Sequence, residues 1–559
     1  MKILNCLLLY ISVLLLSIPY NVIGQQRLEY ASEQLNSHLK EPDLLEIYNN
    51  VKNKSLDGKV LGYIINKELL TQSELSISIE NRYVEFSLEE LDLRGENDFS
   101  WHGQSKDGKG FVVFVFLNGM VSGNVLYEGK SYNFSPLKKS NMTLFYEIDP
   151  QGYPDDHPKV IDKRINSYIN REPHSQIESM TPNSVNNSVR LLIAFTPSAE
   201  AGAASLGYSD MKLFLQQSVS ETNQSFINSN VNHRVKLASG LRVSYTESGD
   251  FSTDLFFFMS TLDPYMNEVH TYRNQYSADV CVLLINNPTA CGVASGIGST
   301  QNSAFAAVHY SCAIGYYSLA HEIGHLHGCR HNPEVDPNTS PYPYGHGYYN
   351  AQNNWRTIMS YDCPGGCVRL PYWSNPDVLF GGIPMGTAHT HDNARVLNAT
   401  SSTIANYRTA PSNLNLGSNS NIDYNEIGEA IAFSTITMSS GFSVALGGEF
   451  YAKAGSSIDA SMLALDEINE DNSVGLINNS LFQIYPNPNL GSFNISINNQ
   501  DSKEAEIIIF DNYGNEVYKN TQYGNGEYRI NLPVNKSGIY YLRLQNQEKS
   551  ETKRVLIEK

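Results

Sequence analysis

The feature that most constrains the fold of this chain is the string His321-Glu-Ile-Gly-His325-Leu-His-Gly328-Cys-Arg-His331. Residues four positions apart share one face of an α-helix, so a helix through this string brings His321 and His325 together. Gly328 can adopt a left-handed backbone conformation that ends the helix and lets the chain turn. We therefore expect His331 to approach the same point from another direction.

Three imidazoles gathered in this way predict a catalytic metal site. Zinc held by three protein ligands keeps an open position for water or substrate, whereas structural zinc sites are closed by a fourth protein ligand. Glu322 follows the first histidine and is placed to polarise a metal-bound water rather than to bind the metal. His327 is out of phase with the ligand face. A helix that is merely rich in histidine would not fix five positions, so we interpret the string as the site of a zinc hydrolase.

A second motif, Thr357-Ile-Met359-Ser-Tyr361, lies downstream, with its methionine 28 residues after His331. Alone, this methionine would be an ordinary core residue. Behind a complete zinc-binding string, the motif resembles the Met-turn of the metzincin peptidases, whose signature H-E-x-x-H-x-x-G-x-x-H this chain also matches. Residues 189–410 therefore resemble a metzincin zinc metallopeptidase.

The resemblance assigns a role to each residue that matches the motifs. It implies that Glu322 is the general base, which accepts a proton from the zinc-activated water and passes it to the leaving amine. It makes Met359 the hydrophobic floor beneath the ligands. The implied zinc ligands are His321, His325 and His331.

Tyr361 departs from the subgroup that this chain resembles most. Segments Arg369–Pro376 and Asp392–Asn398 resemble bacterial reprolysin-like members, and reprolysins generally lack a tyrosine two residues past the methionine. Astacin-like and serralysin-like members have one, as a fifth zinc ligand that can swing away to hydrogen-bond the oxyanion. The resemblance therefore implies a catalytic Tyr361, and a tyrosine that is only packed is the alternative.

The resemblance also implies an edge strand above the cleft, to which an extended polypeptide substrate adds. The segment Ser303–His309 just precedes the zinc-binding helix and is our candidate for this strand. We expect His309 to be a surface or pocket side chain rather than a metal ligand.

Strand and helix patterns alternate around the motifs. Val189–Thr196, Val235–Tyr245 and Val280–Ile285 are predicted strands, and apolar residues recur at helical spacing over Ser209–Asn228 and Asp392–Arg408. Such alternation predicts a mainly parallel sheet covered by helices. We therefore expect an α/β metzincin catalytic domain with a mixed, mainly parallel sheet and an active-site helix.

The N-terminal blocks predict export and a propeptide. Residues 1–24 combine a positive Lys2, an apolar run and a small-residue end, the pattern of a cleaved signal peptide. Residues 25–185 show strand-like runs broken by Gly and Asn. Trp101-His-Gly103, Gly119-Met-Val-Ser-Gly123 and Tyr132-Asn-Phe-Ser-Pro136 resemble a reprolysin-type propeptide, so we expect a β-rich propeptide. It contains no cysteine, which excludes latency through a thiolate on zinc. Carboxylate or steric masking remains, with Asp155-Asp156-His157 as the candidate, and a folding-chaperone or binding module is the alternative.

Small all-β domains are expected after the peptidase-like block. Residues 412–462 have Gly-punctuated β sequence and predict a small β module or spacer, followed by a linker over 463–480. Residues 481–559 predict a β-sandwich whose opening, Tyr485-Pro-Asn-Pro488, resembles the C-terminal sorting domain of type IX secretion. This resemblance implies a Gram-negative bacterial source, passage through the periplasm and contact with the type IX secretion machinery. A carbohydrate-binding or adhesive sandwich is the alternative.

Composition narrows the remaining partners. Lys+Arg 39 and Asp+Glu 57 give a net charge of −18, which disfavours nucleic acid because binding to its backbone needs concentrated cations. The apolar runs are shorter than the ~20 residues that a transmembrane anchor needs. Beyond residue 24, six cysteines lie within 87 positions, and in an exported chain they favour disulfides. We predict the pairs Cys291–Cys312 and Cys363–Cys367 and leave Cys281 and Cys329 unassigned.

The sequence thus predicts a secreted or cell-surface zinc-dependent endopeptidase that acts on extracellular polypeptides. Residues 160–188 are polar and form the expected linker at which the propeptide is cut. The alternative is a catalytically weak surface adhesin or binding protein on a metzincin scaffold. Intact Glu322 favours the enzyme, because a decayed site would have no reason to keep it.

Overall fold

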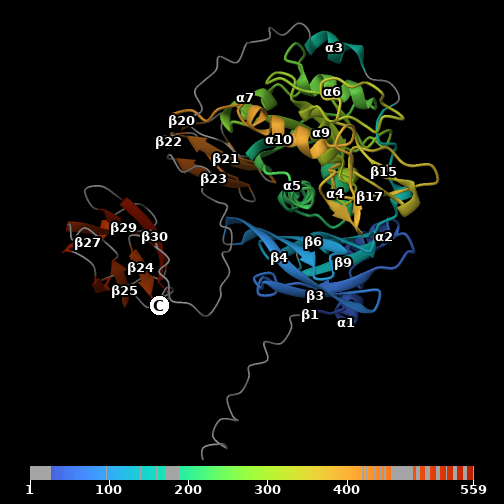
Figure 1. Ribbon diagram of the computed structural model, residues 1–559. Helices are drawn as coiled ribbons and strands as arrows, with labels where there is room; N and C mark the ends of the chain where they lie inside the picture. The colour runs from blue at the N-terminus through green and yellow to red at the C-terminus, as the bar shows by residue number, and fades with distance from the viewer. Residues whose placement is uncertain are drawn as a thin grey trace, which may run out of the picture. The chain divides into compact units, whose positions relative to one another are not determined.

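The computed structural model (Figure 1) describes residues 27–557, except 96, 139, 159–161, 170–187, 418–420, 424, 433–434, 441, 446–447, 455–481, 486–491, 498–503, 511–515, 524–525, 533–537 and 546–549. The predicted signal peptide, the linker 463–480 and most of 160–188 therefore lie outside the described residues. The chain divides into two compact units, residues 1–466 and 467–559. No helix in the described part is long and apolar enough to cross a membrane.

The N-terminal part of the first unit is a nine-stranded sheet in the order β1-β3-β4-β5-β6-β7-β8-β9-β2. From β3 to β9 each strand pairs antiparallel with the next. The apolar run in β6 is continuous because both faces of the strand are covered: Phe114 faces the core of this sheet, and Val115 faces the layer that follows in the chain. The elements are β1 (Arg27–Leu28), α1 (Ser32–His38), α2 (Pro42–Lys52), β2 (Leu61–Ile64), β3 (Glu74–Ile79), β4 (Arg82–Gly95), β5 (Asp98–Ser105), β6 (Gly110–Leu117), β7 (Met120–Tyr127), β8 (Lys130–Pro136), β9 (Met142–Glu147), η1 (Pro150–Gly152) and α3 (Lys163–Ile169).

The next part of the chain forms a seven-stranded sheet in the order β13-β14-β12-β10-β11-β21-β23. Strands β14, β12, β10 and β11 are mutually parallel, whereas β13 and β21 run antiparallel to their neighbours β14 and β11. The sheet is therefore mixed and mainly parallel, as expected from the alternating pattern. Its strands are β10 (Ser188–Phe195), β11 (Arg234–Arg242), β12 (Val280–Ile285), β13 (Gly292–Ala294), β14 (Phe305–His309), β21 (Ile427–Ala432) and β23 (Glu449–Ala454).

The sheet order corrects one prediction and changes another. The segment Ser303–His309 is not the edge strand, because β14 lies between β13 and β12. The edge is β13, whose three residues are too few to show a strand pattern. At the other end, β21 and β23 continue the sheet beyond β11, so part of the stretch 412–462, predicted as a small β module or spacer, belongs to this sheet.

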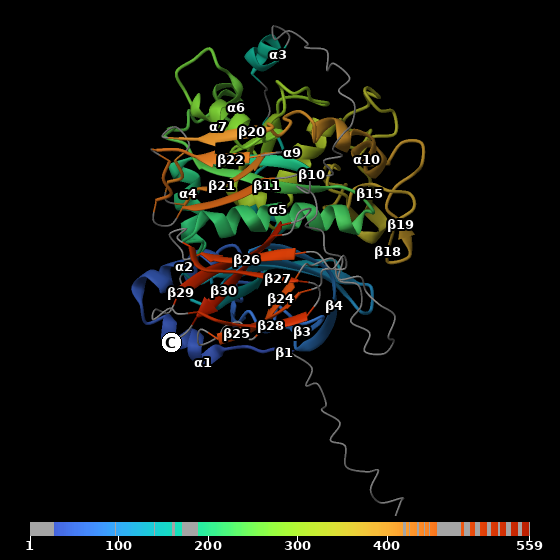
Figure 2. The same cartoon turned by 90° about the vertical axis from the view of Figure 1, so that its left-hand side faces the viewer.

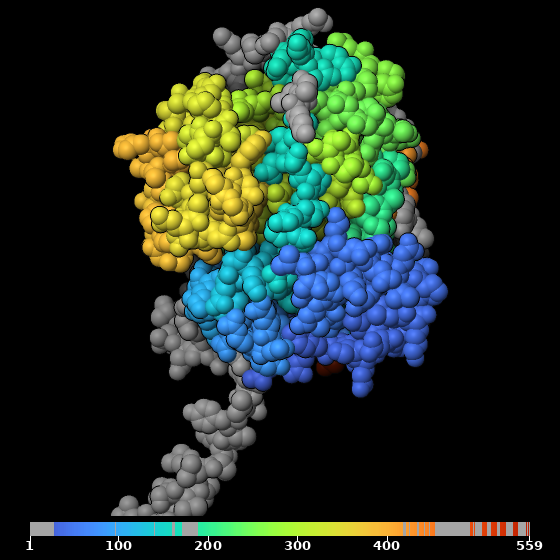
Figure 3. Space-filling model, turned by 90° about the vertical axis from the view of Figure 1, so that its right-hand side faces the viewer, coloured from blue at the N-terminus to red at the C-terminus, as the bar shows by residue number. Residues whose placement is uncertain are grey.

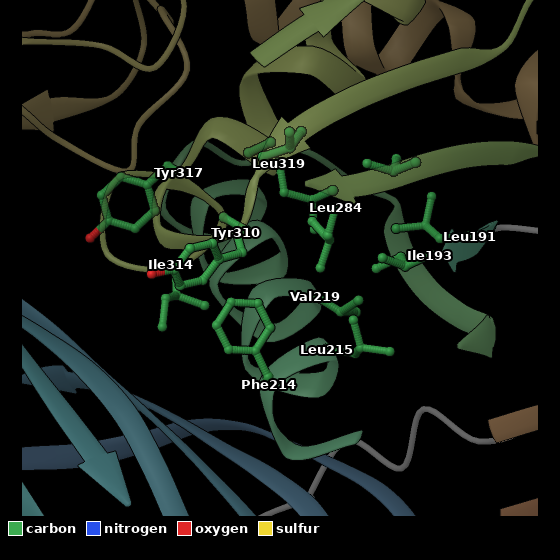
Figure 4. Packing of buried hydrophobic residues seen from close by; sticks show 14 of the residues in the cluster. Leu191, Ile193, Phe214, Leu215, Val219, Leu284, Tyr310, Ile314, Tyr317 and Leu319 are labelled. Atoms are coloured by element: carbon green, nitrogen blue, oxygen red, sulfur yellow. The ribbon is translucent and has the colours of Figure 1, made fainter. Parts of the chain in front are cut away.

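Helix α5 (Met211–Asn228) lies between the two sheets (Figure 2). Its N-cap is Asp210, whose carboxylate accepts a hydrogen bond from the backbone N–H of Lys212. Leu215 and Val219 pack with residues of β10 toward the seven-stranded sheet, as Figure 4 shows. The other helices of this part are α4 (Pro197–Ser205), α6 (Phe251–Met259), α7 (Glu268–Gln275), α8 (Tyr310–Ala313), α9 (Ser318–His327) and α10 (Asn393–Ile404).

The opposite side of α5 meets the nine-stranded sheet through apolar and polar contacts, with Phe214 in one buried cluster with Val115 and Leu117 of β6. Gln217 Nε2 donates to Asn133 Oδ1 at 3.0 Å, and Gln224 Oε1 lies 2.8 Å from Nδ1 of His102. Gln217 and Gln224 are buried at this interface together with the apolar residues.

Short strands complete the first unit, and the second unit has two antiparallel sheets. In the second unit β24-β25-β28 form one sheet and β27-β26-β29-β30 the other, and both contribute to one apolar core that includes Ile495, Ile509 and Leu542. The remaining strands are β15 (Tyr349–Asn350), β16 (Trp355–Arg356), β17 (Val368–Arg369), β18 (Leu379–Phe380), β19 (Ile383–Pro384), β20 (Asn413–Leu416), β22 (Thr435–Met438), β24 (Phe482–Tyr485), β25 (Ser492–Ile497), β26 (Glu504–Phe510), β27 (Glu516–Tyr523), β28 (Gly526–Asn531), β29 (Gly538–Gln545) and β30 (Ser550–Ile557), and a second short helix is η2 (Ala351–Asn353).

Candidate metal centre

Helix α9 presents the first two predicted ligands on one face. The Nε2 atoms of His321 and His325 lie 3.1 Å apart. The helix ends at Gly328, whose φ of 103° is in the left-handed region that a glycine adopts without strain. The chain turns there and brings Nε2 of His331 to 3.2 Å from that of His321 and 2.9 Å from that of His325. The three histidines of the string therefore converge, as the sequence predicts.

A fourth imidazole joins this cluster from a distant part of the chain. His157, in the segment that follows η1, places its Nε2 at 2.9 Å from Nε2 of His321 and 2.8 Å from that of His331. His157 belongs to the triplet that the sequence suggests for masking the site, but no spacing rule identifies it as a ligand, because 164 residues separate it from His321. The candidate metal centre thus has four histidines.

The donor atoms of this cluster fit a zinc ion. The Nδ1–H groups of His321, His325 and His157 donate to the backbone oxygens of residues 358, 329 and 292, at 2.8, 3.0 and 3.0 Å. Their Nε2 lone pairs therefore face one another, an arrangement that is repulsive unless a cation lies between them. Ligands about 2.0–2.1 Å from a tetrahedral zinc lie roughly 3.3 Å apart, which is near the separations found here. Burial lowers the pKa of His157 to about 4 and that of His325 to about 3, so these rings are neutral and able to bind a metal.

Glu322 lies beside the histidine cluster and is not one of the four residues that form it. Its side chain is 1% exposed, and the backbone N–H of Ala294 in the edge strand approaches the carboxylate, which no described side chain hydrogen-bonds. Burial raises the pKa of the carboxyl well above its usual range, and the Arg369 guanidinium opposes this shift. Oε1 lies 3.8 Å from Nδ1 of His157. A Cβ on Gly292 of the edge strand would collide with the Glu322 side chain, so this glycine allows the strand and the carboxylate to approach closely.

Met359 and Tyr361 flank the cluster. A Cβ on Gly324, in the middle of α9, would lie 2.7 Å from Sδ of Met359, so the methionine packs directly beneath the helix that carries the histidines. The ring of Tyr361 lies 4.4 Å from the ring of His331, centroid to centroid. Burial raises the pKa of its hydroxyl above the usual range, so the group stays protonated and able to donate.

Two buried arginines next to the cluster were not predicted as site residues. Arg369 Nη2 lies 2.9 Å from Oδ1 of Asp156, and Arg356 Nη1 lies 3.1 Å from its Oδ2. Burial opposes ionisation of Asp156, but Arg369 and Arg356 together hold its pKa below the usual range. Neither arginine belongs to a recognisable sequence motif. Their shared contact with Asp156 in the folded structure identifies them as a group.

The structure also locates the other residues for which the sequence made a prediction in this region. His327 lies outside the cluster, with its Nδ1 2.7 Å from Oγ1 of Thr400. His309 is likewise outside the cluster, with Nδ1 2.9 Å from Oγ of Ser311. Both predicted disulfides, Cys291–Cys312 and Cys363–Cys367, are present, and Cys281 and Cys329 are buried free thiols. The first disulfide ties the residue before β13 to α8.

Comparison with known proteins gives matches in two parts of the chain. Residues 185–374 match the sequence model of metallopeptidase family M12, and residues 483–558 match that of a secretion-system C-terminal sorting domain. A protein of Stenotrophomonas maltophilia (strain R551-3), named peptidyl-Asp metalloendopeptidase, is 46% identical over 313 residues, which is 55% of this chain and 72% of that protein. A protein of Xanthomonas campestris pv. campestris with the same name is 44% identical over 300 residues, 53% of this chain and 70% of that protein.

Proposed function

The chain belongs to metallopeptidase family M12, and on that premise we propose that it is a secreted zinc endopeptidase that cleaves extracellular polypeptides next to aspartate. The observation that carries the proposal is the convergence of His321, His325 and His331 beside a buried carboxylate, Glu322, that no described side chain hydrogen-bonds. The aspartate preference is taken from the relatives, whose printed names describe peptidyl-Asp metalloendopeptidases.

The residues divide the chemistry between them. Zinc, when held by the three histidines of the string, supplies Lewis-acid polarisation of the scissile carbonyl and lowers the pKa of water. Glu322 accepts a proton from the attacking water and delivers it to the leaving amine nitrogen. The Tyr361 hydroxyl donates to the oxyanion as negative charge develops there. Met359 supports the helix from below and takes no part in proton transfer.

An extended substrate pairs with the edge strand β13. The backbone N–H groups of Cys291 and Gly292, at the start of this strand, already donate to the carbonyl oxygens of Asp155 and Asp156, at 2.7 and 3.1 Å. These donors face a chain that is not part of the sheet, as main-chain recognition of a peptide requires. The peptide bond to be cleaved would then pass between Glu322 and the histidine cluster.

Export and processing are proposed from the N-terminal and C-terminal blocks of the sequence. The sorting-domain match at residues 483–558 supports export by the type IX machinery of a Gram-negative bacterium. We assign residues 25–185 to a propeptide, 189–410 to the peptidase domain and 481–559 to the sorting domain. A surface adhesin on an inactive scaffold is disfavoured, because it would not need a buried carboxylate without a side-chain partner beside four histidines.

A protein-digestion assay tests this function. Casein incubated with the processed protein should be degraded, degradation should stop with a zinc chelator, and it should resume when zinc is restored. Mass spectrometry of the products should show aspartate next to most cut sites. Degradation that continues in the chelator would contradict the metal-dependent chemistry, and cut sites with no preference for aspartate would contradict the substrate assignment alone.

A further inference from the structure

The segment Asp155–His157 crosses the cleft of the peptidase part. In Figure 3 the cyan stretch of chain that follows the N-terminal sheet runs between the green and the yellow parts of the peptidase. Its backbone is fixed by the two hydrogen bonds from Cys291 and Gly292, and the His157 Nδ1–H group donates to the Gly292 oxygen. The segment therefore occupies the place in which an extended substrate would bind.

His157 completes the metal site in a way that prevents catalysis. A catalytic zinc site needs a position for water or substrate, and four protein ligands close it. The Nε2 atom of His157 lies within 3 Å of two of the other three histidines, and its ring lies beside Glu322. With this imidazole as a fourth ligand, the metal would have no open position for a water or a peptide carbonyl.

Asp156 fills a pocket for a negatively charged side chain. The side chains of Arg356 and Arg369 are only 4% and 2% exposed, so their charges are costly to bury without an anion. Nε and Nη2 of Arg369 have no hydrogen-bond partner among the described residues, although Nη2 lies 2.9 Å from Asp156. Arg369 therefore retains N–H groups that are able to donate to a better-aligned carboxylate.

Within the described part of the chain, few other acids can neutralise this pair of arginines. Asp362 lies 3.9 Å from Arg356, but its side chain is 59% exposed, and Glu322 is committed to the proposed proton transfer. When Asp156 leaves, two guanidinium groups therefore face the cleft. A guanidinium pair of this kind binds a carboxylate far better than a neutral side chain of the same size.

We propose that Asp155–His157 is a built-in inhibitor that imitates a bound substrate. Asp156 occupies the Arg356–Arg369 pocket, which in the processed enzyme receives the aspartate side chain of the substrate, and His157 is the fourth metal ligand. The inference rests on the proposed function and deepens it: the same two arginines select the substrate and hold the inhibitor. Latency thus depends on an imidazole at the metal and on a carboxylate that binds arginine rather than zinc.

The first test asks whether His157 closes the metal site. The full chain with Glu322→Gln, which should not cleave itself, is loaded with Co²⁺, and its visible absorption is followed during titration with acetohydroxamate. The parent should show the strong bands of a four-nitrogen tetrahedral site and should not respond to the hydroxamate. His157→Ala should keep one Co²⁺ per chain, lose intensity and bind the hydroxamate, while the control Asp155→Asn should behave as the parent. Equal responses of the parent and His157→Ala would overturn the inference.

The second test asks whether the Arg356–Arg369 pocket recognises a carboxylate. A synthetic peptide with the sequence of residues 153–158 should inhibit the processed enzyme, and the replacement Asp156→Asn in this peptide should weaken inhibition roughly ten- to hundred-fold. Replacing Asp155, which is exposed, should have little effect and serves as the matched control. In the enzyme, the ratio of kcat/KM for an aspartate substrate to kcat/KM for the matching asparagine substrate should fall by tenfold or more on Arg369→Gln.

The outcomes separate this inference from the proposed function. A processed enzyme that degrades casein and holds zinc, but is inhibited equally by the native peptide and by the peptide with Asp156→Asn, overturns the pocket and leaves the peptidase intact. A processed protein that holds no zinc and degrades nothing contradicts the proposed function itself.

Discussion

Replacing Gly324 by alanine would probe how closely the metal-binding helix is packed. An added Cβ would lie 2.6 Å from Cζ3 of Trp373 and 2.7 Å from Sδ of Met359. Both side chains are fully buried, and the Trp373 indole N–H donates to Oγ of Ser225 at 2.9 Å. The indole therefore cannot move aside without breaking a buried hydrogen bond.

Two opposing effects set the magnitude. Inserting a methyl group into a well-packed core typically costs about 1–3 kcal/mol, whereas alanine stabilises a helix interior by about 0.5–1 kcal/mol relative to glycine. We expect overpacking to win, with a net loss of about 1–2 kcal/mol in the free energy of unfolding. For a domain of roughly 200 residues this lowers Tm by about 2–8 °C. Because His321 and His325 flank Gly324, zinc should also be released at a lower chelator concentration.

The assay is thermal unfolding of the full chain, with chelator competition as a second measurement. Both variants are made in a Glu322→Gln background to prevent self-digestion. Gly296→Ala is the matched control, because a Cβ there would meet no atom within 4 Å. If Gly324→Ala unfolds at the Tm of the parent or above it, the tight contact between α9, Met359 and Trp373 is refuted.

Three further predictions follow from the site and from the ends of the chain. Tyr361→Phe should lower kcat with little change in KM or zinc content, the signature of a contact made in the transition state; unchanged kinetics would make Tyr361 a packing residue. N-terminal sequencing of secreted protein should find a start within 160–188, since this polar stretch links the N-terminal sheet to the part that carries the histidine cluster; a start at Gln25 in fully active material would refute both the cleavage and the latency. Deleting 481–559 should leave an active peptidase but trap it in the periplasm, as cell fractionation would show, and normal appearance outside the cell would make this block an accessory module.

The parts of the site that sequence reasoning predicts are those encoded locally. The helical spacing from His321 to His325 and the glycine at 328 determine a helix, its end and the turn to His331. The Asp392 cap of α10 and the apolar run of β12 are likewise short-range signals, and both are found in the structure. Each depends on periodicity or capping within about a dozen residues.

The parts that sequence reasoning misses depend on contacts between distant segments. His157 and Asp156 reach the cleft only because the N-terminal sheet docks on α5 and directs the following chain across β13. Strand β13 is too short to show alternation, which is why the longer run in β14 was mistaken for the edge. Strands β21 and β23 have the same pattern whether they extend a sheet or form their own module, so only tertiary pairing distinguishes the two.

The most direct test of the central claim is the activity and zinc content of Glu322→Gln. Glutamine keeps the size of the side chain and cannot accept the proton, so the processed variant should hold one zinc per chain. Its kcat/KM on an aspartate-containing peptide should fall by about 10²–10⁴-fold, or about 3–5 kcal/mol in the activation free energy. Turnover comparable to that of the wild type would contradict the mechanism, and loss of zinc would show that Glu322 binds the metal instead of serving as the base.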